Sequence, residues 1–160
     1  MAFSVDASEF VVIGPLRRLR EGCAKNRFGS EGNAVASQYA TCRSGGEDGG
    51  VRCFELVRSA DDKRVGFIGL NMSVEDQGSR LAAFISIEFV YLRRRFRGHG
   101  LSEMFLAPVA LCAKTWLRRQ KRRHQSALWK LYLASSPKTD EGEVFVQRFN
   151  RLFRNSKKVK

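Results

Sequence analysis

The sequence predicts one domain of the mixed α+β class, built on a mostly antiparallel sheet. Apolar residues alternate with polar ones in several segments between positions 51 and 92, which indicates strands. After position 101 the apolar residues recur every three or four positions, which indicates helices. A length of 160 residues with 43% hydrophobic residues fits one domain with its own core. We expect this domain over residues 1–153 and a basic, disordered tail over residues 154–160.

The first part of the chain is predicted to hold one strand and two short helices. The strand covers residues 10–13 and is expected to stop at Gly14 and Pro15. Helical spacing of apolar residues indicates the two helices, over residues 16–23 and 33–42. A glycine-rich loop separates them from the rest of the chain.

Three consecutive strands follow, joined by short turns. They cover residues 51–58, 65–72 and 81–92, with turn signals at residues 61–63 and 76–79. Short turns between neighbouring strands predict an antiparallel meander. The third strand is rich in Ile, Phe and Val, so we expect it to be central and buried on both faces.

The last part of the chain alternates helix, strand and helix. We expect a helix over residues 101–119, a basic linker over 118–124, a strand over 127–134 and a final helix over 140–153. A strand that passes through a glycine loop into a helix and then a strand forms a crossover. The last strand should therefore lie parallel to the central one.

The charge balance limits the classes of partner. The chain has 29 Lys and Arg against 16 Asp and Glu, a formal net charge of +13 and a pI of about 10.3. Such a surface favours anionic partners, among them nucleic acid. No apolar run is long enough for a membrane span and no signal peptide is visible, so we expect a cytoplasmic protein without membrane contact. Four cysteines without a CxxC pair argue against a zinc site, and we predict no metal.

The segment that carries chemistry runs over residues 86–102, where an apolar strand enters a turn rich in arginine and glycine that opens a helix. The first N–H groups of a helix have no intrahelical partners, and the helix dipole adds positive potential there. Gly98 and Gly100 let the backbone come close to a phosphate. A pyrophosphate suits such a cradle. The alternative is a tight strand-to-helix turn with an exposed basic face.

The hexapeptide Arg97-Gly98-His99-Gly100-Leu101-Ser102 resembles the Arg-Gly-x-Gly-x-Gly signature of the GNAT superfamily of acyl-CoA-dependent N-acyltransferases. Phe96 and Leu92 also match that pattern. The element order resembles the family over residues 9–153, most closely over 65–137. The resemblance implies a GNAT-like sheet with a strand–glycine loop–helix–strand crossover. Because about seven residues follow the last helix, we expect the family's C-terminal hairpin to be missing.

The resemblance also implies acetyl-CoA as the cofactor. Backbone amides from Gly98 to Glu103 would hold its pyrophosphate, and the strand backbone would pair with the pantetheine arm. His99 would contribute its backbone only. Arginines at 93, 94 and 95 would reach the 3′-phosphate, or else form a solvated face. The predicted cofactor-binding residues are Val90, Tyr91, Leu92, Arg95, Arg97, Gly98, His99, Gly100, Leu101, Ser102 and Glu103.

Three residues are candidates for proton transfer. Glu88 is the sole ionisable carboxylate in the apolar run 81–92, so we expect it to be buried and to act as general base. The alternative is a strand glutamate that faces solvent or pairs with an arginine. The last helix lacks the tyrosine that serves as acid in the family. Tyr132 and Ser135 are the substitutes we predict, although Tyr132 also fits a core aromatic.

The acceptor is inferred from charge. Basic residues concentrate in residues 17–27, 114–130 and 148–160, and the last two groups contain no acid. We therefore predict an N-acetyltransferase for a primary amine on a protein, peptide or aminoacyl-tRNA, with an acceptor associated with tRNA or the ribosome and nucleic acid bound through the basic surface. A GNAT enzyme for a small amine and a non-catalytic CoA-fold module that binds nucleic acid are the alternatives. A homodimer is left open.

Overall fold

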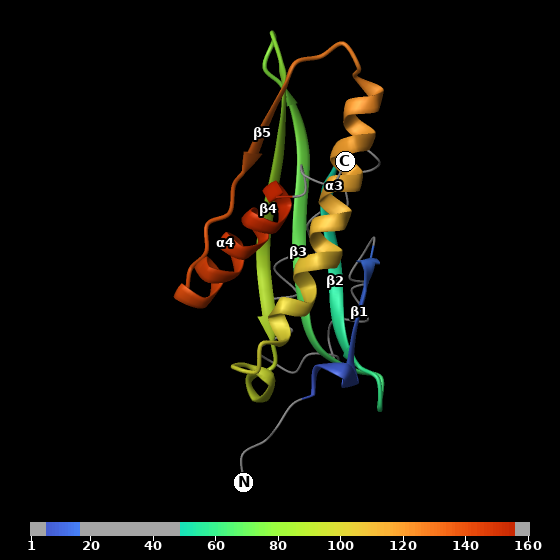
Figure 1. Cartoon of the computed structure of the whole chain (residues 1–160), viewed down its shortest axis with the longest axis vertical. Coiled ribbons are helices and arrows are strands. Elements are labelled where there is room, and N and C mark those ends of the chain that lie inside the picture. Colours follow the sequence, from blue (N-terminus) through green and yellow to red (C-terminus); the bar gives the residue numbers. More distant parts are fainter. Residues whose placement is uncertain (1–5, 17–48, 156–160) are drawn as a thin grey trace.

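The computed structural model describes residues 6–16 and 49–155. They form one five-stranded sheet in the order β1-β2-β3-β4-β5, antiparallel except for the parallel β4–β5 pair. The predicted α+β class, meander and crossover are therefore confirmed (Figure 1). The two helices predicted over residues 16–23 and 33–42 lie outside the described residues, apart from Leu16. The strands are β1 (Phe10–Leu16), β2 (Gly50–Arg58), β3 (Lys63–Asp76), β4 (Leu81–Leu92) and β5 (Trp129–Leu133).

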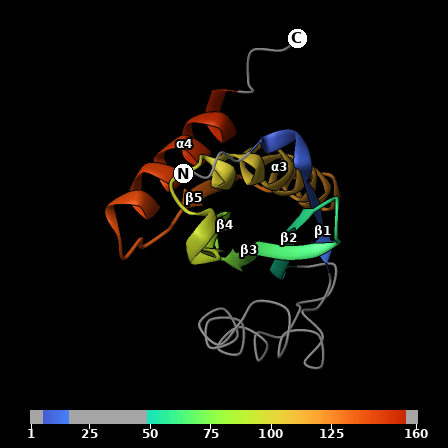
Figure 2. The same ribbon diagram turned by 90° about the horizontal axis from the view of Figure 1, so that it is seen from below.

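Two long helices cover one face of the sheet, α3 (Leu106–Arg123) and α4 (Asp140–Asn155). Figure 2 shows both helices on the same side of the sheet. Three short 3₁₀ helices complete the described elements: η1 (Ala7–Glu9), η2 (Arg94–Phe96) and η3 (Leu101–Phe105). No helix among the described residues is long and apolar enough to cross a membrane.

The core lies between the sheet and the two helices. Leu70 and Ile85 from the strands meet Val109 of α3 and Phe149 of α4, and all four side chains are almost completely buried. Burial of large apolar side chains of this kind stabilises a fold by roughly 1.5–3 kcal/mol each. The core therefore fixes α3 and α4 relative to β4, the strand that leads to the glycine loop.

Several predicted boundaries are wrong. β1 continues through Gly14 and Pro15 to Leu16, with a register shift that accommodates the irregular backbone. Residues 118–123 belong to α3 and not to a linker, because Arg, Lys and Gln favour helix and basic side chains complement the helix C-terminus. The helix begins as 3₁₀ at Leu101. Arg154 and Asn155 end α4, so the predicted tail starts too early.

β4 lies between β3 and β5 and is buried or half-buried on both faces, so the prediction for this strand fails at one residue, Glu88. Gly69 pairs with Phe89 and the next residue, Leu70, pairs with Ile87, so Glu88 is an extra residue in β4 and forms a β-bulge. The side chain of Glu88 is exposed. The sequence did not predict the bulge, because an unbroken apolar run does not show where one of two paired strands has an extra residue.

Because of the bulge, the side chains of β4 that follow Glu88 alternate between the two faces of the sheet in the opposite sense to those that precede it. Ile87, which precedes the bulge, belongs to the core beneath the helices. Phe89 and Tyr91, which follow it, pack on the opposite face against Phe67, with ring centroids 5.4 and 5.1 Å away. The bulge likewise changes which backbone N–H and C=O groups of β4 face β3 and which face β5, and this change shapes the candidate site.

Candidate functional site

The strands β4 and β5 separate beside the bulge. The last β5 residue, Leu133, is opposite Ile85, and the Ala134 N–H donates to the Ile85 carbonyl at 3.0 Å. The Ile87 N–H then donates to the Ser135 hydroxyl at 2.9 Å. Beyond this point β4 continues to Leu92 while the other segment moves away, as Figure 1 shows. A gap between two parallel strands is the result.

The backbone of Val90 and Leu92 faces this gap. The Arg93 N–H donates to the Val65 carbonyl of β3 at 2.8 Å. Backbone groups alternate between the two edges of a strand, so Tyr91 also faces β3, whereas Val90 and Leu92 face away from it. Of the three strand residues predicted to bind the cofactor, the structure therefore places two at the gap. Tyr91 instead packs its ring against β3.

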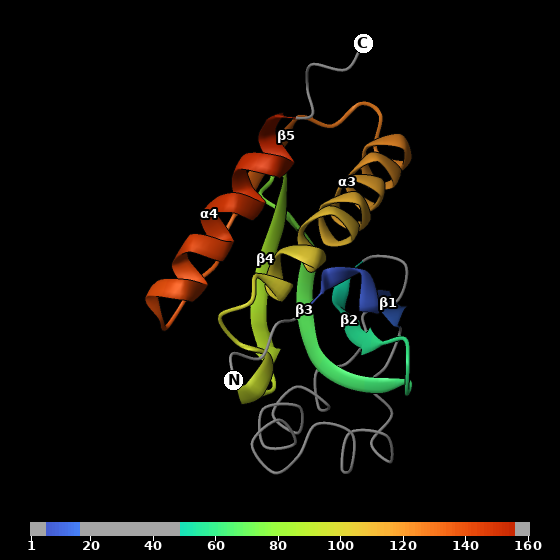
Figure 3. The same cartoon turned by 60° about the horizontal axis from the view of Figure 1, so that its bottom comes forward.

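The glycine loop lies at the end of β4 and leads into α3 (Figure 3). Gly98 and Gly100 have φ values of +79° and +72°, a left-handed conformation that costs other residues roughly 1–2 kcal/mol. A Cβ atom at either position would meet nothing within 4 Å. The backbone conformation, and not lack of space, is therefore what requires glycine at both positions in this structure.

The loop contains backbone donors without backbone hydrogen-bond partners among the described residues. Within the described part of the chain, no backbone hydrogen bond occupies the N–H groups of Gly98, Leu101 and Ser102. The Glu103 N–H, also predicted to bind the cofactor, donates to the Gly100 carbonyl at 3.0 Å in this structure. Amides that open at the start of a helical segment suit a pyrophosphate. The loop thus passes a test of fit for the anionic part of acetyl-CoA.

The arginines of the loop have distinct contacts. Arg97 Nε donates to the Leu92 carbonyl at 2.8 Å, and its guanidinium lies 5.6 Å from the centre of the Tyr91 ring. Arg97 therefore ties the loop to β4 while adding positive charge. The Arg95 guanidinium lies 4.6 Å above the Phe96 ring and remains exposed. It is free to rotate toward a phosphate at modest cost, since an exposed cation–π contact is worth about 0.5–1 kcal/mol.

Glu88 points away from the core. Its carboxylate accepts a hydrogen bond from the Ser86 hydroxyl two residues earlier. The expected burial of Glu88 is wrong, because the bulge projects its side chain into an exposed position. The sequence reasoning also missed Ser86. The period of two in a strand was the available signal, since it places residues 86 and 88 on neighbouring parts of one face.

The two candidate acids differ in position. Tyr132 stacks on Phe84 with ring centroids 4.8 Å apart, and Lys130 Nζ lies 4.7 Å above the tyrosine ring. This pair lies before the point where the strands separate. The hydroxyl of Ser135 is at the separation itself. The geometry therefore favours Ser135 over Tyr132 as a group that acts inside the gap.

The last helix contributes packing and one ion pair. Phe145, Phe149 and Phe153 of α4 are buried in the core. Arg148 of α4 pairs with the carboxylate of Glu103 in η3, and both side chains are partly exposed. This pair, which the sequence reasoning also missed, connects α4 to the segment that follows the glycine loop.

Comparison with known proteins identifies the fold. No protein-family model and no curated protein sequence matches the chain. The KacTA–DNA complex is 15% identical, covers 87% of this chain and 82% of its own, and gives a TM-score of 0.51. A tyrosine-to-phenylalanine mutant of KacT is 15% identical over 90% of this chain and 85% of its own, with a TM-score of 0.52. Glucosamine-6-phosphate N-acetyltransferase from Arabidopsis thaliana is 15% identical over 88% and 90%, with a TM-score of 0.43.

The chain shares the fold of the two KacT structures, and this fold is the GNAT fold. The predicted resemblance and fold class are confirmed. At 15% identity the likeness concerns the arrangement of strands and helices, and the chemistry must be argued from the site.

Proposed function

We propose that the protein is an acetyl-CoA-dependent N-acetyltransferase that acetylates a primary amine. One observation carries the proposal: β4 and β5 separate before Val90, and β4 runs on to a loop where, among the described residues, no backbone hydrogen bond occupies the amides of Gly98, Leu101 and Ser102. Open backbone groups at Val90, followed further along the chain by open amides at the glycine turn, suit a long thiol cofactor with a pyrophosphate.

The residues of the gap and loop would hold the cofactor. Val90 would pair with its amide-bearing arm, and the open loop amides would bind its pyrophosphate. Arg97 holds the loop on β4, and the exposed Arg95 would reach a phosphate of the cofactor. Bound acetyl-CoA supplies an acetyl group activated as a thioester.

Two side chains would transfer protons in this reaction. Glu88 Oε would accept a proton from the incoming ammonium group, which must be neutral before its nitrogen can attack. The Ser86 hydroxyl orients that carboxylate. The Ser135 hydroxyl accepts from Ile87 and keeps its own proton available for a hydrogen bond to the departing sulfur. No tyrosine is needed on α4 in this arrangement.

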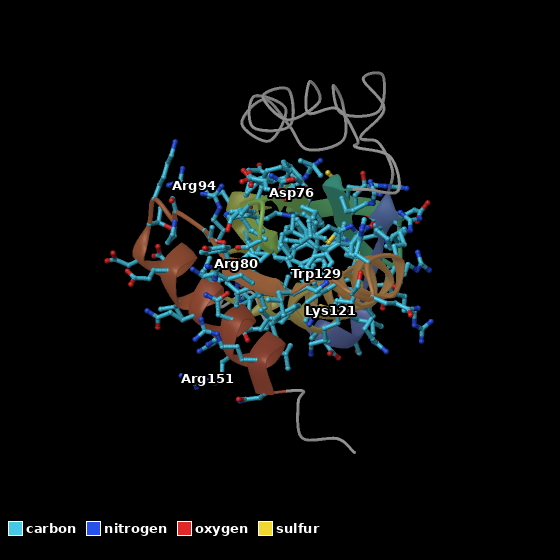
Figure 4. The ribbon with its side chains drawn as sticks, turned by 90° about the horizontal axis from the view of Figure 1, so that it is seen from above. Asp76, Arg80, Arg94, Lys121, Trp129 and Arg151 are labelled. Carbon is cyan, nitrogen blue, oxygen red and sulfur yellow. The ribbon has the colours of Figure 1, made fainter. Side chains whose placement is uncertain are left out.

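The acceptor we propose is a protein, a peptide or an aminoacyl-tRNA, in the cytoplasm. Its support is the net charge of +13 and the basic residues exposed on both helices. Figure 4 labels Arg80 in the turn before β4, Lys121 of α3 and Arg151 of α4. A small polycationic amine would be repelled by such a surface, whereas an acceptor on RNA or on an acidic protein surface would be attracted.

Two measurements test the proposal. Saturating acetyl-CoA should raise the melting temperature, and no shift would overturn the cofactor assignment. Release of the free thiol should then depend on the acceptor. We expect turnover with aminoacyl-tRNA or a lysine-containing peptide, and none with deacylated tRNA. Turnover with spermidine alone would instead identify a small-amine enzyme, and binding without any turnover would identify a non-catalytic module.

A further inference from the structure

The strand β5 forms one edge of the sheet, and its outer backbone groups are open. The Leu81 N–H donates to the Leu128 carbonyl at 2.8 Å, and the Ala134 N–H donates to the Ile85 carbonyl. In this parallel register Lys130 and Tyr132 bond to β4, so Trp129, Leu131 and Leu133 turn their N–H and C=O groups outward. In the part of the chain that the structure describes, no backbone hydrogen bond reaches these outward groups.

The same edge exposes apolar side chains. Leu128 is 72% exposed and Leu131 is 40% exposed. Leu131 lies on the helix side of the sheet, because its neighbours Trp129 and Leu133 pack against the core there. An edge strand with apolar residues and open hydrogen-bonding groups is a template for pairing with another strand.

The opposite edge of the sheet is different. β1 contains Pro15, which has no N–H to donate, and its register shifts between Ile13 and Leu16. Proline and irregular register are features that keep an edge strand from pairing. β5 has neither feature. The two edges of one sheet are therefore unequal, and only β5 among the described strands is both regular and open.

The positive charge of the residues around β5 favours an acidic partner at this edge. Residues 114–138, which include β5, contain eight Lys and Arg and no Asp or Glu. Lys130 projects from the face opposite Leu131, beside Tyr132. Pairing with a second copy of this chain would bring two such basic segments together. An acidic segment would be attracted.

We propose that the open edge of β5 binds an extended acidic segment of a protein partner as a sixth strand. The outward groups of Trp129, Leu131 and Leu133 form the hydrogen bonds. Side chains of the added strand alternate, with apolar residues beside Leu131 and Asp or Glu beside Lys130. This surface is independent of the proposed acetyl transfer.

The test uses the full chain and a blocked eight-residue peptide of alternating Glu and Val. Calorimetry gives its affinity, and amide exchange followed by NMR should show new protection at Leu131 and Leu133. Leu131→Pro removes an outward donor and leaves the bonds to β4 in place. Its matched control is Leu131→Thr, which removes the same leucine but retains the N–H. We expect the proline variant to bind about tenfold more weakly and the threonine variant less than about threefold.

A second probe leaves the protein unchanged. The same peptide with alternate nitrogens methylated on one edge cannot pair with a strand, so it should not bind to the wild-type chain. This arm keeps the proposal testable if Leu131→Pro fails to fold. A peptide with Lys in place of Glu should bind much more weakly.

Four results would overturn the proposal. They are equal affinity of the proline and threonine variants, equal binding of the methylated peptide, equal binding of the lysine peptide, and protection of the two amides by an oligoribonucleotide alone. A dimer in sedimentation that Leu131→Pro dissociates would show that a second copy occupies the edge instead.

Discussion

The Ser135 hydroxyl accepts a hydrogen bond from the Ile87 N–H across 2.9 Å, directly beside the bulge at Glu88. The Ser135 hydroxyl oxygen occupies the position that a backbone carbonyl oxygen of β5 would occupy if β5 continued. The chain can therefore leave β4 without a buried N–H losing its partner, which would cost about 1–3 kcal/mol. The gap that would admit a thioester begins at this hydrogen bond.

Ser135→Ala should lower both activity and stability. Loss of a proton donor at the gap should reduce kcat about 100-fold, and the unpaired Ile87 N–H should lower the free energy of unfolding by about 1–3 kcal/mol. Ser136→Ala is the control, because Ser136 is exposed and its loss should change stability by less than about 0.5 kcal/mol. Steady-state kinetics and urea unfolding give both values. If Ser135→Ala keeps the wild-type kcat, Ser135 only shapes the gap.

Glu88→Gln should remove the general base. We expect kcat/KM to fall about 100-fold, with little change in acetyl-CoA affinity, because the carboxylate acts on the acceptor amine. Ser86→Ala removes only the hydrogen bond that orients this carboxylate, so its effect should be smaller. Thiol-release kinetics and calorimetry separate turnover from binding. Wild-type turnover by the glutamine variant would exclude Glu88 as the base.

Gly100→Ala and Gly78→Ala form a matched pair. Their φ values are +72° and +78°, and an added Cβ meets nothing within 4 Å at either position. Each substitution should therefore cost about 1 kcal/mol in stability. Only Gly100→Ala should also weaken acetyl-CoA binding, by at least about tenfold, because only Gly100 shapes the amide cradle. Equal cofactor affinity of the two variants would contradict the assigned pyrophosphate site.

Asp61 should titrate well below an ordinary aspartate. The side-chain hydrogen bond from Arg58 is the largest cause, and it lowers the pKa of Asp61 from 3.8 to about 2. Because the folded value lies below the unfolded one, the ionised form favours folding above pH 4. This contribution should disappear as pH falls through about 2. NMR titration of the Asp61 carboxyl checks the value, and Arg58→Gln should raise the midpoint toward 3.8.

The exposed basic residues of α3 should contribute to RNA binding through phosphate contacts. Arg118→Gln combined with Arg122→Gln removes two charges from one face of the helix. The slope of log K against log salt should fall by about two, with similar losses for different RNA sequences. Lys63→Gln, at the first residue of β3, is the control. An unchanged slope in the double variant would remove α3 from the RNA surface.

The sequence by itself determined the succession of elements and the place of the anion cradle. Alternation and turn residues identified β2, β3 and β4, and the motif from Arg97 to Ser102 indicated the loop with its two left-handed glycines. These features are local, because strand period, turn chemistry and helix start depend on neighbouring residues. Longer-range pairing was inferred correctly only for the parallel crossover, where handedness leaves little choice.

The tertiary structure decided how the site is assembled. The bulge at Glu88 depends on how β3 and β4 share their hydrogen bonds, so the run of apolar residues could not reveal it. The bond between Ser135 and Ile87 joins residues 48 positions apart. The open edge of β5 likewise follows from the order of strands. Such contacts depend on which segments meet in space, and local sequence patterns do not predict them.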